Sequence, residues 1–170
     1  MIDWIIKSFP LPPSINNAFM PVMDKIKWRD GKPKAKGKMV KTYEHKDYES
    51  ACVLWELGHM KGVNILREEI RLRSVELKKK KENLILKVQM FAVFRKERIF
   101  TKENDIQRLD ADNRCKLAQD KFFQILNLDD KHVFRNEIEK VPGDSDYMII
   151  QIKEHLPMTE EVLKGILRLK

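Results

Sequence analysis

The chain has 170 residues, of which 42% are hydrophobic; this length fits one domain, and this composition excludes wholesale disorder. Its formal net charge of +8 and its pI of about 9.4 are typical of a protein with an anionic partner, most often nucleic acid. No apolar run approaches transmembrane length and the N-terminus lacks a secretory signal, so no membrane partner is expected and the protein is predicted to be cytoplasmic.

The first part of the chain is predicted to contain a short strand followed by a basic segment. Residues 4–9 form an apolar run that three prolines end, which indicates a strand entering a turn, and the loop continues to residue 17. Residues 23–42 contain glycine and proline and have little to bury, so they predict a flexible loop or a loose hairpin arm. From residue 25 to residue 46 there are nine basic residues and two acids, so the segment carries +7 of the net charge.

This basic segment has two interpretations. Its lysines either make phosphate contacts with DNA or only keep a linker solvated. On the first interpretation, the DNA-binding residues are Lys25, Lys27, Arg29, Lys32, Lys34, Lys36 and Lys38.

Periodicity predicts the remaining elements. Apolar residues near a four-residue spacing indicate helices, and alternating ones indicate strands. In chain order these are helices over 43–60 and 65–81 with a break at Gly62 and Asn64, a strand over 84–94, a charged connection over 96–106, a strand end or loop over 108–112, a helix over 113–126, strands over 133–141 and 147–154, and an amphipathic helix over 159–169.

This mixture of helices and expected antiparallel strands predicts the α+β class, with a small mixed or antiparallel sheet packed with helices in a single domain. The predicted domain covers residues 1–156, with the basic loop or arm at 23–42. Residues 157–170 are predicted to form an added C-terminal helix, with Thr159 as its N-cap.

A cluster of carboxylates surrounds one lysine between residues 110 and 130. Carboxylates so close in sequence repel one another unless a divalent cation or a basic side chain lies among them. Their oxygens suit the hard cations Mg²⁺, Mn²⁺ and Ca²⁺, although a D-x-D or an Asp-Asp pair is often an ordinary turn. The members are Asp110, Asp112, Asp120, Asp129 and Asp130, with Lys116 among them.

The spacing of these residues predicts how they meet. Asp110 and Asp112 are two apart, so in an extended backbone they point the same way. Asp112, Lys116 and Asp120 are four apart, so on a helix they share one face. A calcium loop of the EF-hand type is excluded, because Cys115 and Lys121 stand where glycine and glutamate are needed.

Two motifs taken together resemble the RusA-like Holliday-junction resolvases. Residues 108–120 read Arg-Leu-Asp-Ala-Asp-Asn-Arg-Cys-Lys-Leu-Ala-Gln-Asp, and a Leu-Asp-Asp follows at 128–130. The family pattern is D-x-D-N-x-x-K, an aspartate four residues on, and a D-D pair that opens a strand. Residues 10–17, Pro-Leu-Pro-Pro-Ser-Ile-Asn-Asn, are similar to the family's Pro-Pro-Ser-x-Asn segment. The resemblance spans roughly residues 4–154.

The resemblance implies a homodimeric endodeoxyribonuclease, dependent on Mg²⁺ or Mn²⁺, that cuts four-way DNA junctions symmetrically in DNA recombination and repair. By position, the catalytic residues would be Asp110, Asp112, Lys116 and Asp130, with Asp110, Asp112 and Asp130 holding the metal. The long basic segment, the two helices after it and the added C-terminal helix depart from the family, which leaves junction selectivity open.

Two further functions agree with the same residues. One is a non-catalytic nucleic-acid-binding protein in which the acids form an ion-pair set with Lys116. The other is a related metal-dependent nuclease that acts on flaps or replication forks. His132, two residues after Asp130, either approaches the site or, as we expect, lies on a strand surface.

Overall fold

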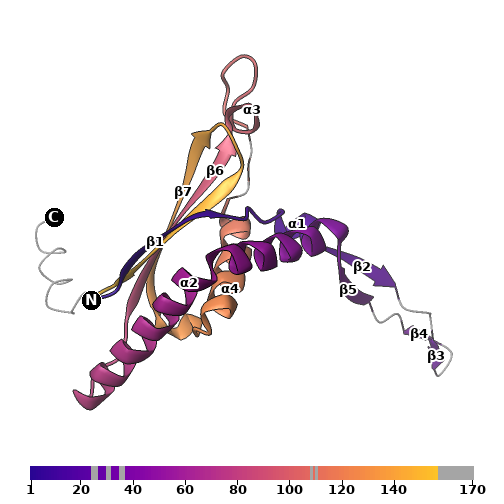
Figure 1. Ribbon diagram of the computed structural model, residues 1–170. Coiled ribbons are helices and arrows are strands. Elements are labelled where there is room, and N and C mark those ends of the chain that lie inside the picture. The colour runs from indigo at the N-terminus through magenta and orange to yellow at the C-terminus, as the bar shows by residue number, and fades with distance from the viewer. Residues whose placement is uncertain (24–26, 30–31, 35–36, 108, 110, 157–170) are drawn as a thin grey trace, which may run out of the picture.

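A four-stranded sheet forms the framework of the protein, with strand order β1-β8-β6-β7 (Figure 1). The computed structural model describes residues 1–23, 27–29, 32–34, 37–107, 109 and 111–156; for residues 15, 16, 21–23, 27–29, 32–34, 37 and 38 it describes the backbone alone. The elements are β1 (Asp3–Phe9), α1 (Ile15–Ala18), β2 (Phe19–Met23), β3 (Lys27–Arg29), β4 (Lys32–Lys34), β5 (Gly37–Lys41), α2 (Tyr43–Lys79), β6 (Leu86–Arg95), α3 (Lys96–Ile99), α4 (Asp112–Leu126), η1 (Asp130–His132), β7 (Val133–Gly143) and β8 (Tyr147–Glu154).

The sheet is mixed, which confirms the predicted α+β class. β8 runs antiparallel to both β1 and β6, as expected for this sheet. β7, however, runs parallel to β6 and does not neighbour β8, although the two are consecutive in the chain. The chain between β6 and β7 passes through α4, and such a crossover is what a parallel pair requires.

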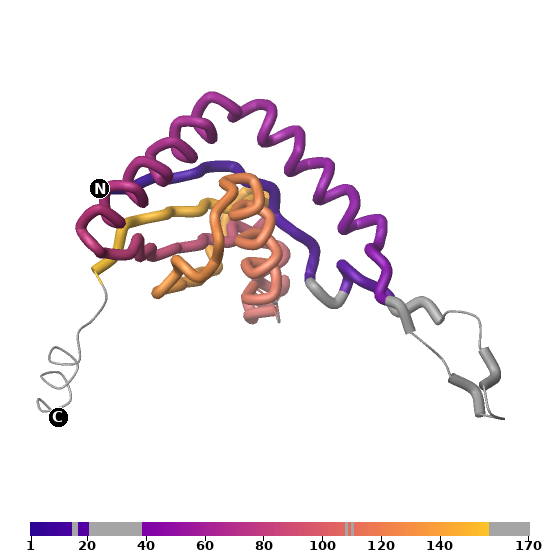
Figure 2. The backbone as a smooth tube through the Cα atoms, turned by 90° about the horizontal axis from the view of Figure 1, so that it is seen from below, coloured from indigo at the N-terminus to yellow at the C-terminus, as the bar shows by residue number. Residues whose placement is uncertain are grey.

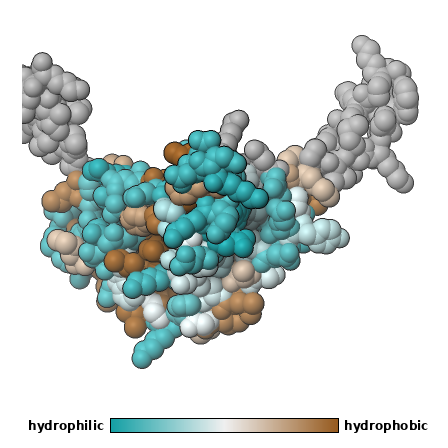
Figure 3. All heavy atoms as spheres, turned by 90° about the horizontal axis from the view of Figure 1, so that it is seen from above, coloured by the Kyte–Doolittle hydropathy of each residue, from teal (hydrophilic) through white to brown (hydrophobic). Residues whose placement is uncertain are grey.

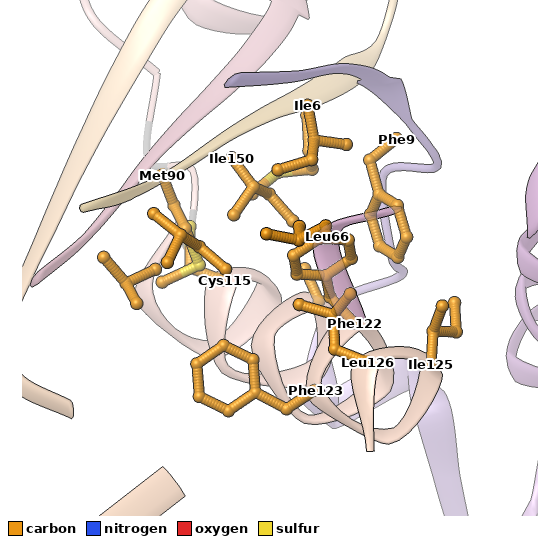
Figure 4. Close-up of a cluster of buried hydrophobic side chains, with 14 of the residues drawn as sticks. Ile6, Phe9, Leu66, Met90, Cys115, Phe122, Phe123, Ile125, Leu126 and Ile150 are labelled. Atoms are coloured by element: carbon orange, nitrogen blue, oxygen red, sulfur yellow. The ribbon is translucent and has the colours of Figure 1, made fainter. Parts of the chain in front are cut away.

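The core lies between one face of the sheet and the helices α2 and α4. Along β6 and β8 alternate residues are buried, so their apolar side chains share one face. Figure 4 shows side chains from β1, α2, β6, α4 and β8 pointing toward one another in this core. The fully buried members include Phe9, Leu66, Met90, Cys115, Phe122 and Ile150.

Helix α2 is continuous over 37 residues, so the predicted break at Gly62 and Asn64 is wrong. Glycine inside a helix costs only about 1 kcal/mol relative to alanine, and burial of Val63, Leu66 and Ile70 on one face continues through the region. The helix bends in its central part (Figure 2), as helices do near glycines.

The outer face of α2 is not uniformly polar. Several large hydrophobic side chains are exposed along it, and hydrophobic surface lies beside hydrophilic surface on the α2 side, the lower part of Figure 3. The exposed hydrophobic side chains of α2 are those of Val53, Leu54, Leu57, Met60, Ile65, Leu72 and Val75. Within the described residues, no helix combines the length and the apolar character that crossing a membrane requires.

The described backbone of the basic segment forms antiparallel strand pairs, so of the two predicted alternatives it is a hairpin. β2 pairs with β5 and β3 pairs with β4. Thr42 connects β5 to α2: its hydroxyl donates to the Asn17 carbonyl at 2.6 Å and accepts from the His45 backbone N–H at 3.3 Å, which caps the helix. The predicted C-terminal helix lies outside the described residues.

Both cysteines are expected to be unreactive in the folded protein. Cys52 and Cys115 are fully buried, and burial raises their thiol pKa values to about 11 and about 12. Because the thiolate is the reactive form, we expect neither to react with a maleimide at pH 8 until denaturant is added. Mass spectrometry of the labelled chain measures this, and rapid labelling of the folded chain would contradict the burial.

Candidate active site

Helix α4 presents the central part of the carboxylate cluster. Asp112 is its first residue, and Asp112, Lys116 and Asp120 are all exposed. Between them the helix buries Cys115 and its other apolar residues. The helix and its polar face are therefore as predicted. At the N-terminus of α4, the carboxylate of Asp112 also meets the positive end of the helix dipole.

The predicted geometry of the Asp-x-Asp pair does not hold at its middle residue. Ala111 has helical φ and ψ of −85° and −36°, so the alternation of an extended strand does not apply between residues 110 and 112. The cause is that α4 begins earlier than expected, with Ala111 as its N-cap. Asp110, a predicted metal ligand, lies outside the described residues.

The chain reverses at the end of α4 and brings Asp130 back toward the helix. Asn127 adopts the left-handed conformation (φ 53°, ψ 43°), and the Leu128 N–H donates to the Phe123 carbonyl at 2.9 Å, as in a helix C-cap. Asp130 then follows as the first residue of η1 and is exposed. After this turn, Asp130 lies within electrostatic range of Asp120.

The two adjacent aspartates of the predicted D-D pair have different surroundings. The Asp129 carboxylate accepts from the Lys131 backbone N–H at 3.0 Å and pairs with the Lys131 ammonium at 2.9 Å. The backbone and side-chain hydrogen bonds from Lys131 lower the pKa of Asp129 to about 2. Asp129 therefore caps the turn, whereas Asp130 begins η1 and is exposed.

Electrostatic interactions link Asp120, Lys116 and Asp130. Partial burial raises the pKa of the Asp120 carboxyl, the Lys116 charge opposes this increase, and the Asp130 charge adds to it. Two carboxylates and an ammonium group thus influence one another across the turn between α4 and η1. Among the described residues, no group of three His, Cys, Asp or Glu side chains is placed to hold a metal ion.

The N-terminal motif lies against the first turn of α4. The Arg114 guanidinium donates to the Pro12 carbonyl at 2.6 Å and lies 5.8 Å from the centre of the Phe94 ring. Ser14 then accepts backbone hydrogen bonds from Asn17 and Ala18, so residues 15–18 form the short helix α1 where a loop was predicted. Arg114 therefore connects the proline-rich N-terminal motif to the helix that carries Asp112. The sequence did not indicate this role, because Pro12, the partner of Arg114, is far away in the chain.

A cleft of about 520 Å³ adjoins this junction. Its walls come from the proline segment, the first turns of α2, and an ion pair in which Arg98 contacts Asp146 at 2.7 Å. Asp146 also accepts from the Arg95 backbone N–H at 2.8 Å. Neither Arg98 nor Asp146 was predicted, since an ion pair across 48 residues leaves no local signal.

The remaining predicted residues are His132 and the basic residues of the hairpin. His132 is the last residue of η1 and not part of a strand, so the expected strand-surface position is wrong; its ring lies 3.0 Å from the Leu84 carbonyl. The predicted DNA-binding side chains, Lys25 to Lys38, lie outside the described part of the chain.

Compared with known proteins, the chain matches no family model, and a search of curated proteins also finds no match.

Proposed function

We propose that the protein is a metal-dependent endodeoxyribonuclease that hydrolyses phosphodiester bonds in four-way DNA junctions. The observation that carries the proposal is the exposed face of α4, on which Asp112 and Lys116 lie one turn apart. Two features of the surroundings support it: η1 returns Asp130 toward Asp120, and Arg114 joins the Pro-Pro-Ser motif to the same helix.

The donor chemistry of this cluster suits Mg²⁺ or Mn²⁺. Asp112 and Asp130 are exposed and supply hard oxygen ligands, and Asp110 is the third proposed ligand. When bound, the metal supplies a water of lowered pKa and a Lewis acid for the scissile phosphate. Lys116 is proposed to place its ammonium group where charge develops on the phosphate, and so to stabilise the transition state.

The basic hairpin is proposed to hold the DNA backbone. Replacing Lys32, Lys34, Lys36 and Lys38 with alanine is expected to weaken binding to junctions and to plain duplex alike, because phosphate contacts carry no sequence information. The slope of log affinity against log salt should become shallower by up to about 0.9 for each lost contact. Fluorescence anisotropy over a salt series measures this, and an unchanged slope would mean that these lysines do not touch DNA.

We also propose a homodimer. A four-way junction has two strands to cut at symmetry-related points, and a two-fold dimer presents two equivalent sites to them. Sedimentation equilibrium at micromolar concentration should give twice the mass of the chain. A mixed dimer of wild-type and Asp112→Asn chains is expected to nick a junction without resolving it, whereas a monomer that cuts both strands in one binding event would exclude this arrangement.

A panel of labelled DNA substrates tests the function itself. Four-way junctions, flaps, forks and duplex of matched sequence are incubated with Mg²⁺, with Mn²⁺ and with EDTA. Paired cuts in the junction, dependent on the metal, are the expected result. Preferential cleavage of flaps or forks would favour the related nuclease. Tight binding without cleavage under any condition would favour the non-catalytic binding protein.

A further inference from the structure

A largely apolar groove lies between β1 and the middle of α2, on the flank of the sheet. It has a volume of about 450 Å³. Trp55 forms part of its wall and stacks on His59, with ring centres 4.4 Å apart. Its indole N–H points at the Lys7 carbonyl, 3.4 Å away. We call this space the β1–α2 groove; the residues that line it include Trp4, Ile5, Trp55, Gly58, His59 and Gly62.

The floor of the groove is open above two glycines. A Cβ atom added at Gly58 or at Gly62 would meet nothing within 4 Å. A helix normally disfavours glycine by about 1 kcal/mol relative to alanine, so two glycines one turn apart are a cost to α2. Glycine does allow close approach by another segment of chain, and nothing among the described residues fills this space.

Exposed hydrophobic side chains continue the groove along its edges. Ile5 of β1 is 55% exposed, and on α2 Leu54, Ile65 and Leu72 are 70%, 45% and 53% exposed. Spacings of 11 and 7 residues place these three on one face of a helix with about 3.6 residues per turn. Ile65 is three residues from Gly62 and Leu54 is four from Gly58, so the row borders the open floor.

The described chain ends beside this groove. The Glu154 backbone N–H donates to the Ile2 carbonyl at 2.8 Å, and its carboxylate pairs with Arg73 of α2 at 2.7 Å. Leu156, two residues later, is 88% exposed. The His155 backbone N–H then donates to the Ile85 carbonyl at 2.8 Å, on the β6 side of β8. The described chain therefore ends at the edge of the sheet where β1 begins, near the C-terminal half of α2.

The next 14 residues have the pattern and the length to occupy it. As a helix, residues 159–169 would span about 16 Å, whereas the path from Ile2 to Ile6 along β1 is about 13 Å. The apolar residues would lie on one face and the charged ones on the other. The first set is Met158, Val162, Leu163 and Ile166; the second is Glu160, Glu161, Lys164 and Arg168.

We propose that residues 157–170 dock as an amphipathic helix in the β1–α2 groove of their own chain, antiparallel to α2. The apolar face of the segment covers the open floor above Gly58 and Gly62. In this arrangement the chain reverses its direction at Pro157, because proline favours turns. This inference is independent of the proposed nuclease function.

Tryptophan fluorescence of the full chain tests the docking. Trp28→Phe leaves Trp4 and Trp55, both in the groove, as the only reporters. In this background Leu163→Asp with Ile166→Asp should shift the emission to longer wavelength and increase quenching by acrylamide. Lys164→Asp, on the opposite face of the segment, is the matched control and should change neither.

Limited trypsin digestion gives a second readout from the segment itself. Cleavage at Lys164 and Arg168 should be at least about tenfold faster in the double aspartate variant, since each buried Leu or Ile contributes more than the free energy equivalent to a factor of ten. Gly62→Leu should have the same effect from the groove side. Because the space above Gly62 is open, this variant should keep its circular dichroism spectrum.

The outcomes separate the occupants of the groove. Protection of both tryptic sites that is independent of protein concentration supports docking within one chain. Protection that is lost on dilution would overturn it in favour of the segment of a second copy. Equal digestion of wild type and all variants, with unchanged emission, would show that the segment does not bind the groove.

Discussion

Asp112→Asn is expected to abolish cleavage of four-way junctions while junction binding is kept or strengthened. Asp112 is exposed at the first residue of α4, so the substitution removes the charge of a proposed metal ligand, and with it a negative charge that would face a phosphate. Loss of several kcal/mol of metal-assisted stabilisation corresponds to a decrease of about 10³-fold or more in rate. Single-turnover cleavage with Mg²⁺ and anisotropy binding in EDTA measure the two effects.

The fold should tolerate this change. A carboxylate at a helix N-terminus contributes about 0.3–1 kcal/mol through the dipole, so a small decrease in the free energy of unfolding is expected. Asp144→Asn, at an exposed residue between β7 and β8, is the matched control and should cut at the wild-type rate. A wild-type rate in Asp112→Asn itself would remove Asp112 from the metal site.

Lys116→Ala is expected to reduce turnover sharply with little effect on folding or on junction binding. Loss of a preorganised charge contact costs about 3 kcal/mol in the transition state, which is a decrease of about two orders of magnitude in the single-turnover rate constant. Because the Lys116 side chain is exposed, its loss removes little packing, and the rate reports the charge.

Two further variants show whether the decrease in rate reflects the charge of Lys116. Lys121→Ala removes a lysine of the same helix whose ammonium contacts Gln124 at 3.2 Å, and it should leave the rate unchanged. Lys116→Arg keeps the charge and should recover part of the activity. If Lys116→Ala cleaves at the wild-type rate, the lysine only balances the carboxylates, since its charge opposes the increase in pKa that burial causes at Asp120.

The spacing of apolar residues correctly predicted the elements that depend on neighbouring residues alone. The polar and apolar faces of α4 and the alternation along β8 follow from spacings of a few residues. α2 was divided incorrectly because a glycine signal is worth about 1 kcal/mol, less than the burial of Val63, Leu66 and Ile70 that continues beyond it. The parallel pairing of β7 with β6 was missed because strand partners far apart in sequence leave no local pattern.

In the candidate site, too, local spacing predicted some features and only tertiary structure revealed the others. The shared face of Asp112, Lys116 and Asp120 followed from a four-residue spacing. The difference between Asp129 and Asp130 did not, because it arises from a backbone N–H that only the folded turn places beside Asp129. The contact of Arg114 with Pro12 joins residues 102 apart in the chain, so only tertiary structure could reveal it.

The position of β8 also determines when the chain can fold during synthesis. Within the described sheet, β1 pairs only with β8, and β8 lies between β1 and β6. The backbone of β1 therefore stays unpaired within the described sheet until β8, which ends at residue 154, has emerged from the ribosome. Such non-local pairing slows folding and prolongs exposure to aggregation. A premature stop before residue 147 would thus yield an unfolded chain and not a smaller folded protein.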